Sequence, residues 1–183
     1  PDASLTAGVA LARAYNAQVQ GDDSETIRQA EMALQLISDG DVMRRAQAAI
    51  MLQFTHWSSG DLAAALAAIE DWMESMTRLG NQIFAIASAF AAADLLASLG
   101  RLAGAEQVYL QALEQAAQQG PEAEHITAHH HLGLAMLYRQ RGQDDLAAHH
   151  WQLADERGRQ TTLIDWPHRW CVARAYLKEA AGE

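Results

Sequence analysis

Residues 100–112 have the sequence GRLAGAEQVYLQA and residues 142–154 the sequence GQDDLAAHHWQLA, and these two similar blocks decide the fold. Each block opens with a glycine from a series whose members lie 39, 40, 42 and 40 residues apart: Gly21, Gly60, Gly100, Gly142 and Gly182. Glycine adopts the left-handed conformation that ends a helix without a side-chain clash. A recurrence with a period near 40 residues therefore predicts an array of helical hairpins, in which each hairpin buries its apolar face against its neighbours.

Offsets from these glycines predict which side chains pack between helices. Five residues after the glycine the chain has Thr26, Ala65, Ala105 and Ala147. Nine residues after it the chain has Ala30, Ile69, Tyr109 and Trp151, and twelve residues after it Ala33, Trp72, Ala112 and Ala154. These offsets share one helix face, so we expect large side chains to fit against small ones. The aspartates that follow Gly21 and Gly60 are placed to cap the next helix, and the spacing of Asp22 and Glu25 allows a capping box.

The small, large, small pattern resembles the tetratricopeptide (TPR) repeat, although the period exceeds the roughly 34 residues of a TPR unit and approaches that of HEAT repeats. Two segments extend the resemblance: HHHLGLAMLYRQRGQDDLAAHHW at 129–151 and DWPHRWCVARAYLKEAAGE at 165–183. Both are similar to the TPR-like superhelical region of MalT-type bacterial transcription regulators, which are large ATP-dependent regulators of the LuxR type.

The resemblance implies an all-α, TPR-like α-solenoid, a right-handed superhelix of about nine helices in antiparallel pairs. We expect one domain over 1–183, with hairpins at about 5–38, 41–79, 82–119 and 122–160 and half a repeat at 167–183. In that family the superhelix follows a nucleotide-binding region and precedes a DNA-binding helix-turn-helix, and it senses an inducer or partner. The chain has no G-x-x-x-x-G-K-[ST] loop and no basic recognition helix. Its first residue is Pro1 and it stops one residue after Gly182, so we expect it to be the sensor region of a longer regulator.

Charge and composition argue against several classes of function. The chain has 13 basic and 23 acidic residues and a net charge of −10, which argues against direct binding of nucleic acid. No apolar run has the roughly 18 to 20 residues that a bilayer span requires, and no signal peptide is visible, so we expect a cytoplasmic protein without a membrane partner. The single cysteine, Cys171, is expected to be a small core residue.

Neither catalysis nor a cofactor is expected. The acidic pairs Asp22–Asp23 and Asp144–Asp145 fall at helix starts, where capping and the helix dipole account for them. His125 and His129 have the i, i+4 spacing of a metal-chelating pair, but no Cys pair or HExxH motif accompanies them. We therefore interpret the histidines of 125–131 as a polar, partly exposed helix face.

The remaining class is a binding protein, and the same offsets predict its groove, because the first helices of successive TPR hairpins line one surface. Six residues before each glycine the chain has Tyr15, Phe54, Asp94, Met136 and Tyr176. Trp57, Arg139, Arg169 and Phe90 complete the predicted groove. The alternative is that Tyr15, Phe54 and Met136 only fill gaps between hairpins.

Three hypotheses of function follow from this. The first is a sensor that binds a small inducer, a peptide or a protein, contacts other domains of its own regulator and self-associates. The second is a protein-interaction scaffold without a small-molecule inducer. The third is a metal-binding protein that uses the histidines.

Overall fold

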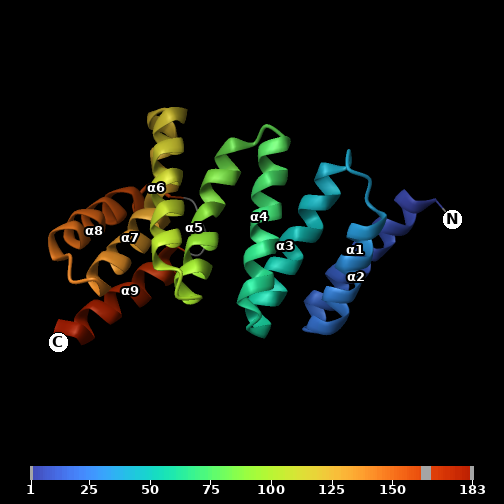
Figure 1. Cartoon of the computed structure of the whole chain (residues 1–183), viewed down its shortest axis with the longest axis horizontal. Helices are drawn as coiled ribbons and strands as arrows, with labels where there is room; N and C mark the ends of the chain where they lie inside the picture. The colour runs from blue at the N-terminus through green and yellow to red at the C-terminus, as the bar shows by residue number, and fades with distance from the viewer. Residues whose placement is uncertain (1, 162–165, 182–183) are drawn as a thin grey trace. The chain divides into compact units, whose positions relative to one another are not determined.

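The computed structural model describes residues 2–161 and 166–181, and all regular structure in that part of the chain is helical (Figure 1). These residues form nine α-helices and one 3-10 helix, with no β-strand among them. Successive helices pack as neighbours, with α1 against α2, α3 against α4, and α7 against α8. The predicted all-α, TPR-like solenoid class is confirmed.

Contacts divide the chain into two compact units, residues 1–100 and residues 101–183. The first unit contains α1 (Ala3–Gln20), α2 (Asp23–Leu36), α3 (Val42–Ser59), α4 (Leu62–Arg78) and α5 (Gln82–Ser98). The second unit contains α6 (Leu102–Gln119), η1 (Pro121–Thr127), α7 (Ala128–Gln140), α8 (Asp144–Gly158) and α9 (Trp166–Ala181). The single domain over 1–183 and the limits of its hairpins stay predictions.

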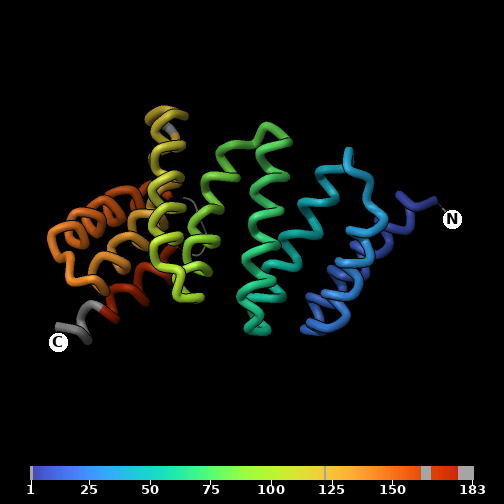
Figure 2. Tube along the Cα trace, viewed as in Figure 1, coloured from blue at the N-terminus to red at the C-terminus, as the bar shows by residue number. Residues whose placement is uncertain are grey.

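In the first unit the helices run alternately up and down. Figure 2 shows the α1–α2 and α3–α4 turns at one edge of this unit, and the α2–α3 and α4–α5 connections at the opposite edge. Helices α1 and α3 therefore run in the same direction, and they also contact each other. Residues at equal offsets from Gly21 and Gly60 consequently lie near the same edge of the unit.

Aspartate side chains begin the first four helices. Asp22 and Asp61 accept hydrogen bonds from the backbone N–H groups of Glu25 and Ala64, both at 3.0 Å, and Asp2 and Asp41 do the same for α1 and α3. Of the capping box predicted for Asp22 and Glu25, only one half forms, namely the hydrogen bond from the Glu25 N–H to the Asp22 side chain. The carboxylate of Glu25 instead accepts hydrogen bonds from Arg28 and Gln29, and the Asp22 N–H donates to a carbonyl of α1.

Glycines in the left-handed region close the predicted turns. Gly21, Gly60, Gly100 and Gly142 have φ values of 74°, 85°, 75° and 69°, which confirms their role, and Gly182 lies outside the described residues. Gly80 and Gly120, which are not members of the predicted series, also have positive φ values, 74° after α4 and 97° after α6. From Gly60 to Gly120 such a glycine therefore stands every 20 residues, once per helix instead of once per hairpin.

The predicted packing stripe lies in the core of both units. The residues five after each glycine, Thr26, Ala65, Ala105 and Ala147, are all buried. Gly133 of α7 lies directly against the ring of Tyr109 of α6, where a Cβ would stand 2.2 Å from the Tyr109 Cζ. The fit of large side chains against small ones is confirmed.

Aromatic side chains build the core of the second unit. Trp166 of α9 is buried with Ala128, Leu132, Ala154 and Ala173, and Met136, Trp151 and Trp170 pack against this cluster. The rings of Trp151 and Trp170 stack with centroids 4.4 Å apart, and those of Trp166 and Trp170 at 5.4 Å. The expectation that Cys171 is a small core residue is wrong, because Cys171 is exposed.

Candidate functional site

Large aromatic side chains are exposed on the first helices of the first unit. Tyr15 of α1 is 57% exposed, and Phe54 and Trp57 of α3 are 52% and 57% exposed. Side chains that only filled gaps between hairpins would be covered. The gap-filling alternative therefore does not apply to Tyr15 or Phe54.

Phe54 and Trp57 open into one shallow surface depression of about 430 Å³. It is lined by Gln18, Asp23, Phe54, Thr55, Trp57 and Ser58, and we call it the aromatic depression. Its walls come from the end of α1, the start of α2 and the last two turns of α3. The Gly21 turn joins the first two of these elements, so one tight turn sets Gln18 and Asp23 beside the rings.

Two polar groups of the depression, the hydroxyls of Thr55 and Ser58, bond to the backbone of α3, whereas the side chains of Gln18 and Asp23 do not. The hydroxyl of Thr55 donates to the Met51 carbonyl at 2.9 Å, and that of Ser58 donates to the Thr55 carbonyl at 3.0 Å, so the backbone of α3 already engages both. Asp23 makes no ion pair with any described residue. The depression thus offers two aromatic faces, an amide and a carboxylate.

Neither Gln18 nor Asp23 is among the predicted groove residues. Gln18 occupies the same offset before Gly21 that Trp57 occupies before Gly60, so the offset could have indicated it. Asp23 was explained by its place in the first turn of α2, where the structure does put it. Its proximity to α3 depends on how the hairpins pack, which the offsets of a single repeat do not contain.

The other predicted groove residues lie elsewhere. Phe90 and Asp94 of α5 are half-buried, and the backbone carbonyl of Asp94 accepts a hydrogen bond from Ser98. The exposed apolar side chains of α5 are instead Ile83 and Phe84. None of these four side chains lines the aromatic depression.

Four predicted groove residues belong to the second unit. Met136 packs against the tryptophan core, so the gap-filling alternative fits this residue. Arg139 and Tyr176 are exposed and Arg169 is half-buried. The charge of Arg169 acts on the buried His129, whose pKa it helps to lower.

The histidines of α7 are buried, so the interpretation as a polar, partly exposed face is wrong for them. His129 and His130 are both 0% exposed, and His131 is nearly buried. The ring of His129 makes an edge contact with Trp166 at 5.2 Å, and that of His130 with Tyr109 at 6.4 Å. Each of these two rings thus packs edge-on against an aromatic side chain in the interior of the second unit.

Burial keeps these imidazoles neutral. It lowers the pKa of His129 from 6.5 to about 3, and the positive charge of Arg169 adds to the effect. Burial likewise lowers the pKa of His131 to about 3, with further contributions from His150, His130, Arg157 and His149. The pKa of His150 is lowered by burial and by His149.

The residues named for a metal site do not form one in the described part of the chain. His125 lies in η1 and His129 in α7, so the two are not one turn apart on a single α-helix. No group of three or more histidine, cysteine or carboxylate side chains among the described residues could hold a metal ion.

The paired helices, the buried small-residue stripe and the exposed aromatic face of the first helices define a TPR-like helical-repeat protein. Comparison with protein families agrees: the chain belongs to the MalT-like TPR region family, whose model matches residues 7–183. Helical repeats of this type are generally scaffolds without catalytic groups. A search among curated proteins found no match. None of the described helices combines the length and the apolar character needed to cross a bilayer.

Proposed function

We propose that this chain is the sensing region of a bacterial transcription regulator of the MalT type, and that it binds its ligand or partner at the aromatic depression. The observation that carries the proposal is the pair of exposed rings, Phe54 and Trp57, which open into one depression with unengaged polar groups. Exposed aromatic side chains beside a few polar groups are typical of binding surfaces. The proposed region acts without catalysis, in the cytoplasm, and contacts DNA only through another domain.

In this proposal binding shifts the regulator between a resting and an active form. A ligand can do this only by binding one form more tightly than the other. To change the ratio of active to resting form from about 1:99 to 99:1, the ligand must bind the active form more tightly by roughly 5.5 kcal/mol. Contacts with other domains of the regulator, or with a second copy of it, would then favour the form that the ligand selects.

The second candidate is an interaction scaffold without a small-molecule inducer, and the open shape of the depression favours it. Sites for small molecules usually enclose most of the ligand surface. Here both rings keep about half of their surface exposed around a shallow hollow, which is more typical of contact with part of a larger partner.

A stability screen with two arms separates these candidates. The first arm contains sugars and amino acids, and the second contains short peptides of varied charge. A ligand at about 100 times its dissociation constant adds about 2.7 kcal/mol to the stability of the protein. Hits only in the first arm support an inducer sensor, and hits only in the second support a scaffold.

Variants locate each hit. Phe54→Ala and Trp57→Ala should abolish the stabilisation, whereas Phe84→Ala removes an equally exposed ring of the same unit outside the depression and should retain it. Stabilisation that survives in the first two variants would show that the ligand binds elsewhere. If no compound in either arm raises the stability of the protein, the result contradicts sensing by this region.

A further inference from the structure

We infer that the aromatic depression binds the guanidinium group of an arginine in an extended peptide segment of a partner protein. This inference rests on the proposed function and deepens it by naming the chemistry of the partner. Three observations carry it: the aromatic faces, the carboxylate beside them, and the charge of the unit that contains them.

The first observation concerns the rings. Phe54 and Trp57 are three residues apart on α3, and both line the depression. The face of an aromatic ring attracts a cation, and tryptophan attracts it most strongly. Arginine makes this contact more often than lysine does, because its flat guanidinium also stacks on the ring.

The second observation concerns Asp23. Its carboxylate lines the same depression and makes no ion pair with a described residue. A guanidinium stacked on Trp57 has N–H groups at its edge that can donate to such a carboxylate. Gln18 adds an amide oxygen on the α1 side of the depression.

The third observation concerns charge in the first unit. Residues 1–100 contain 12 acidic residues, five arginines and no lysine. Arg28, Arg44 and Arg45 pair with Glu25, Asp41 and Asp71, and Arg78 donates to the backbone carbonyl of Asp39. A cationic segment therefore meets an acidic surface whose own cations are largely engaged, while an anionic ligand would be repelled.

The shape of the depression selects a peptide over a free small cation. A volume of about 430 Å³ accommodates one long side chain and its neighbouring backbone, but the rings stay half exposed and cannot enclose a small molecule. Affinity must then come from the chain on either side of the arginine, which lies against the acidic surface.

The test uses the ¹⁵N-labelled chain and nuclear magnetic resonance, with the indole N–H of Trp57 and the amides of Thr55 and Ser58 as reporters. The probe is the capped pentapeptide Gly-Ser-Arg-Ser-Gly. Its citrulline counterpart has nearly the same shape without the charge, and argininamide represents the free cation. We expect the arginine peptide to shift the reporters at the lowest concentration, and the other two to bind at least about threefold more weakly.

Matched variants separate a defined site from general attraction to an acidic protein. Asp23→Asn and Asp144→Asn each remove one negative charge from the first turn of a helix, but only Asp23 lines the depression. Trp57→Leu and Phe84→Leu each remove one exposed ring, but only Trp57 lines the depression. We expect a loss of affinity of about three- to tenfold in Asp23→Asn and Trp57→Leu, and none in the two controls. Thermal melting of all four variants verifies folding.

Each contrary outcome has its own meaning. Equal binding of the citrulline peptide, or equal weakening in Asp23→Asn and Asp144→Asn, overturns the guanidinium inference and leaves the depression as a binding site. Equal binding of argininamide overturns the peptide part. If neither these probes nor the hits of the stability screen shift the reporters, the proposed function fails as well.

Discussion

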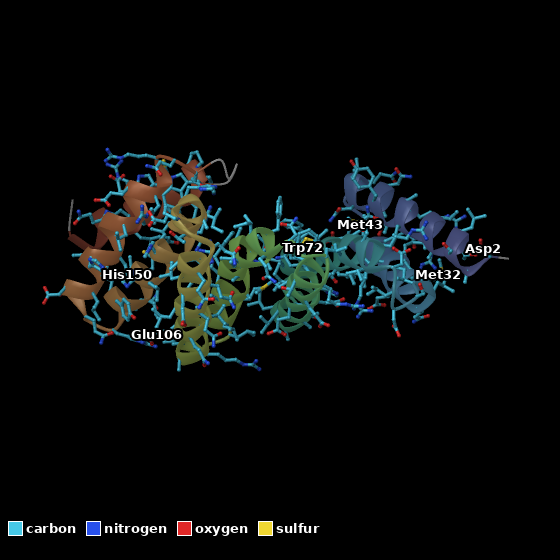
Figure 3. All side chains as sticks on the ribbon, turned by 90° about the horizontal axis from the view of Figure 1, so that it is seen from above. Asp2, Met32, Met43, Trp72, Glu106 and His150 are labelled. Atoms are coloured by element: carbon cyan, nitrogen blue, oxygen red, sulfur yellow. The ribbon has the colours of Figure 1, made fainter. Side chains whose placement is uncertain are left out.

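His131 and His150 meet through their Nδ1 atoms, which are 2.9 Å apart between α7 and α8. At this distance one Nδ1 donates a hydrogen bond and the other accepts it, so the pair holds one proton between the two atoms. His150, labelled in Figure 3, also stacks at a tilt on Tyr138 with ring centroids 5.4 Å apart. A second proton on the pair would place two N–H groups face to face.

We therefore predict that acid destabilises the second unit. The folded pKa values of His129 and His131, about 3, lie below the ordinary 6.5, so between these values the unfolded chain binds more protons than the folded chain. Stability is complete above about pH 6.5 and falls as the pH falls, by up to about 1.4 kcal/mol per pH unit for each such histidine. Urea denaturation followed by circular dichroism at pH 7.5 and 5.0 measures the loss.

Two variants assign this effect. His131→Gln keeps a hydrogen-bonding group opposite His150 and removes one titrating imidazole, so it should reduce the loss between the two pH values. His168→Gln changes an exposed histidine of α9 that does not contribute to the lowered pKa values of His129, His131 or His150, so it should leave the loss unchanged. Equal urea midpoints at both pH values in the unmodified protein would contradict the prediction.

Gly133→Ala should destabilise the second unit by about 1–3 kcal/mol, because the added methyl group overlaps the Tyr109 ring at 2.2 Å. Gly8→Ala is the matched control inside α1, where the new Cβ meets only the Arg44 Nη2 at 3.9 Å. That change should stabilise by up to about 1 kcal/mol, since alanine is the better helix former. Thermal unfolding of both variants measures the difference.

A double variant tests the cause in Gly133→Ala. Tyr109→Leu removes the ring atoms that the methyl group would meet, so the combined loss should be smaller than the sum of the two single losses. A strictly additive pair would show that the ring contact is not the cause.

Gly80→Ala should cost about 1–2 kcal/mol, because Gly80 has a φ of 74° and an L-residue is strained there. Its control is Gly40→Ala, which also adds a methyl group in open space but at a glycine outside the positive-φ set. Chemical denaturation should show no loss, or a slight gain, for the control. Equal effects of the two changes would argue that Gly80 does not need its conformation.

Most of the fold is predictable from the sequence because the signals that specify it are local. The turn glycines and the stripe of Ala65, Ala105 and Ala147 depend only on neighbours within one hairpin. The spacing of 20 residues was harder to predict. The residues that precede Gly80 and Gly120 belong to α4 and α6, and they share no offset pattern with the residues that precede the glycines of the first helices. A period near 40 residues was thus correct for the hairpin and incomplete for the single helix.

The errors concern features that depend on packing between distant segments. The prediction that His129 is partly exposed rested on its polarity alone, whereas Trp166, 37 positions later in the chain, covers it. Asp23 looked like a helix-start residue and nothing more, because only the packing of α1 and α2 on α3 brings it beside Phe54 and Trp57. Met136 shared an offset with Phe54 and yet packs inward, since α9 supplies tryptophans that cover it.

Trp72→Phe should destabilise the first unit through a single lost hydrogen bond. The Trp72 indole, labelled in Figure 3, donates from Nε1 to the Ser88 hydroxyl at 3.0 Å and so links α4 to α5. Phenylalanine retains most of the packing, and a net hydrogen bond contributes about 0.5–1.5 kcal/mol. Ser88→Ala removes the same bond from the other side, so the two single losses should not add in the double variant. Ser98→Ala removes a hydroxyl of the same helix that donates to the Asp94 carbonyl within α5, and it should have little effect. If Trp72→Phe and Ser88→Ala prove additive by urea denaturation, the indole bond does not couple the two helices, and packing alone holds α5 against α4.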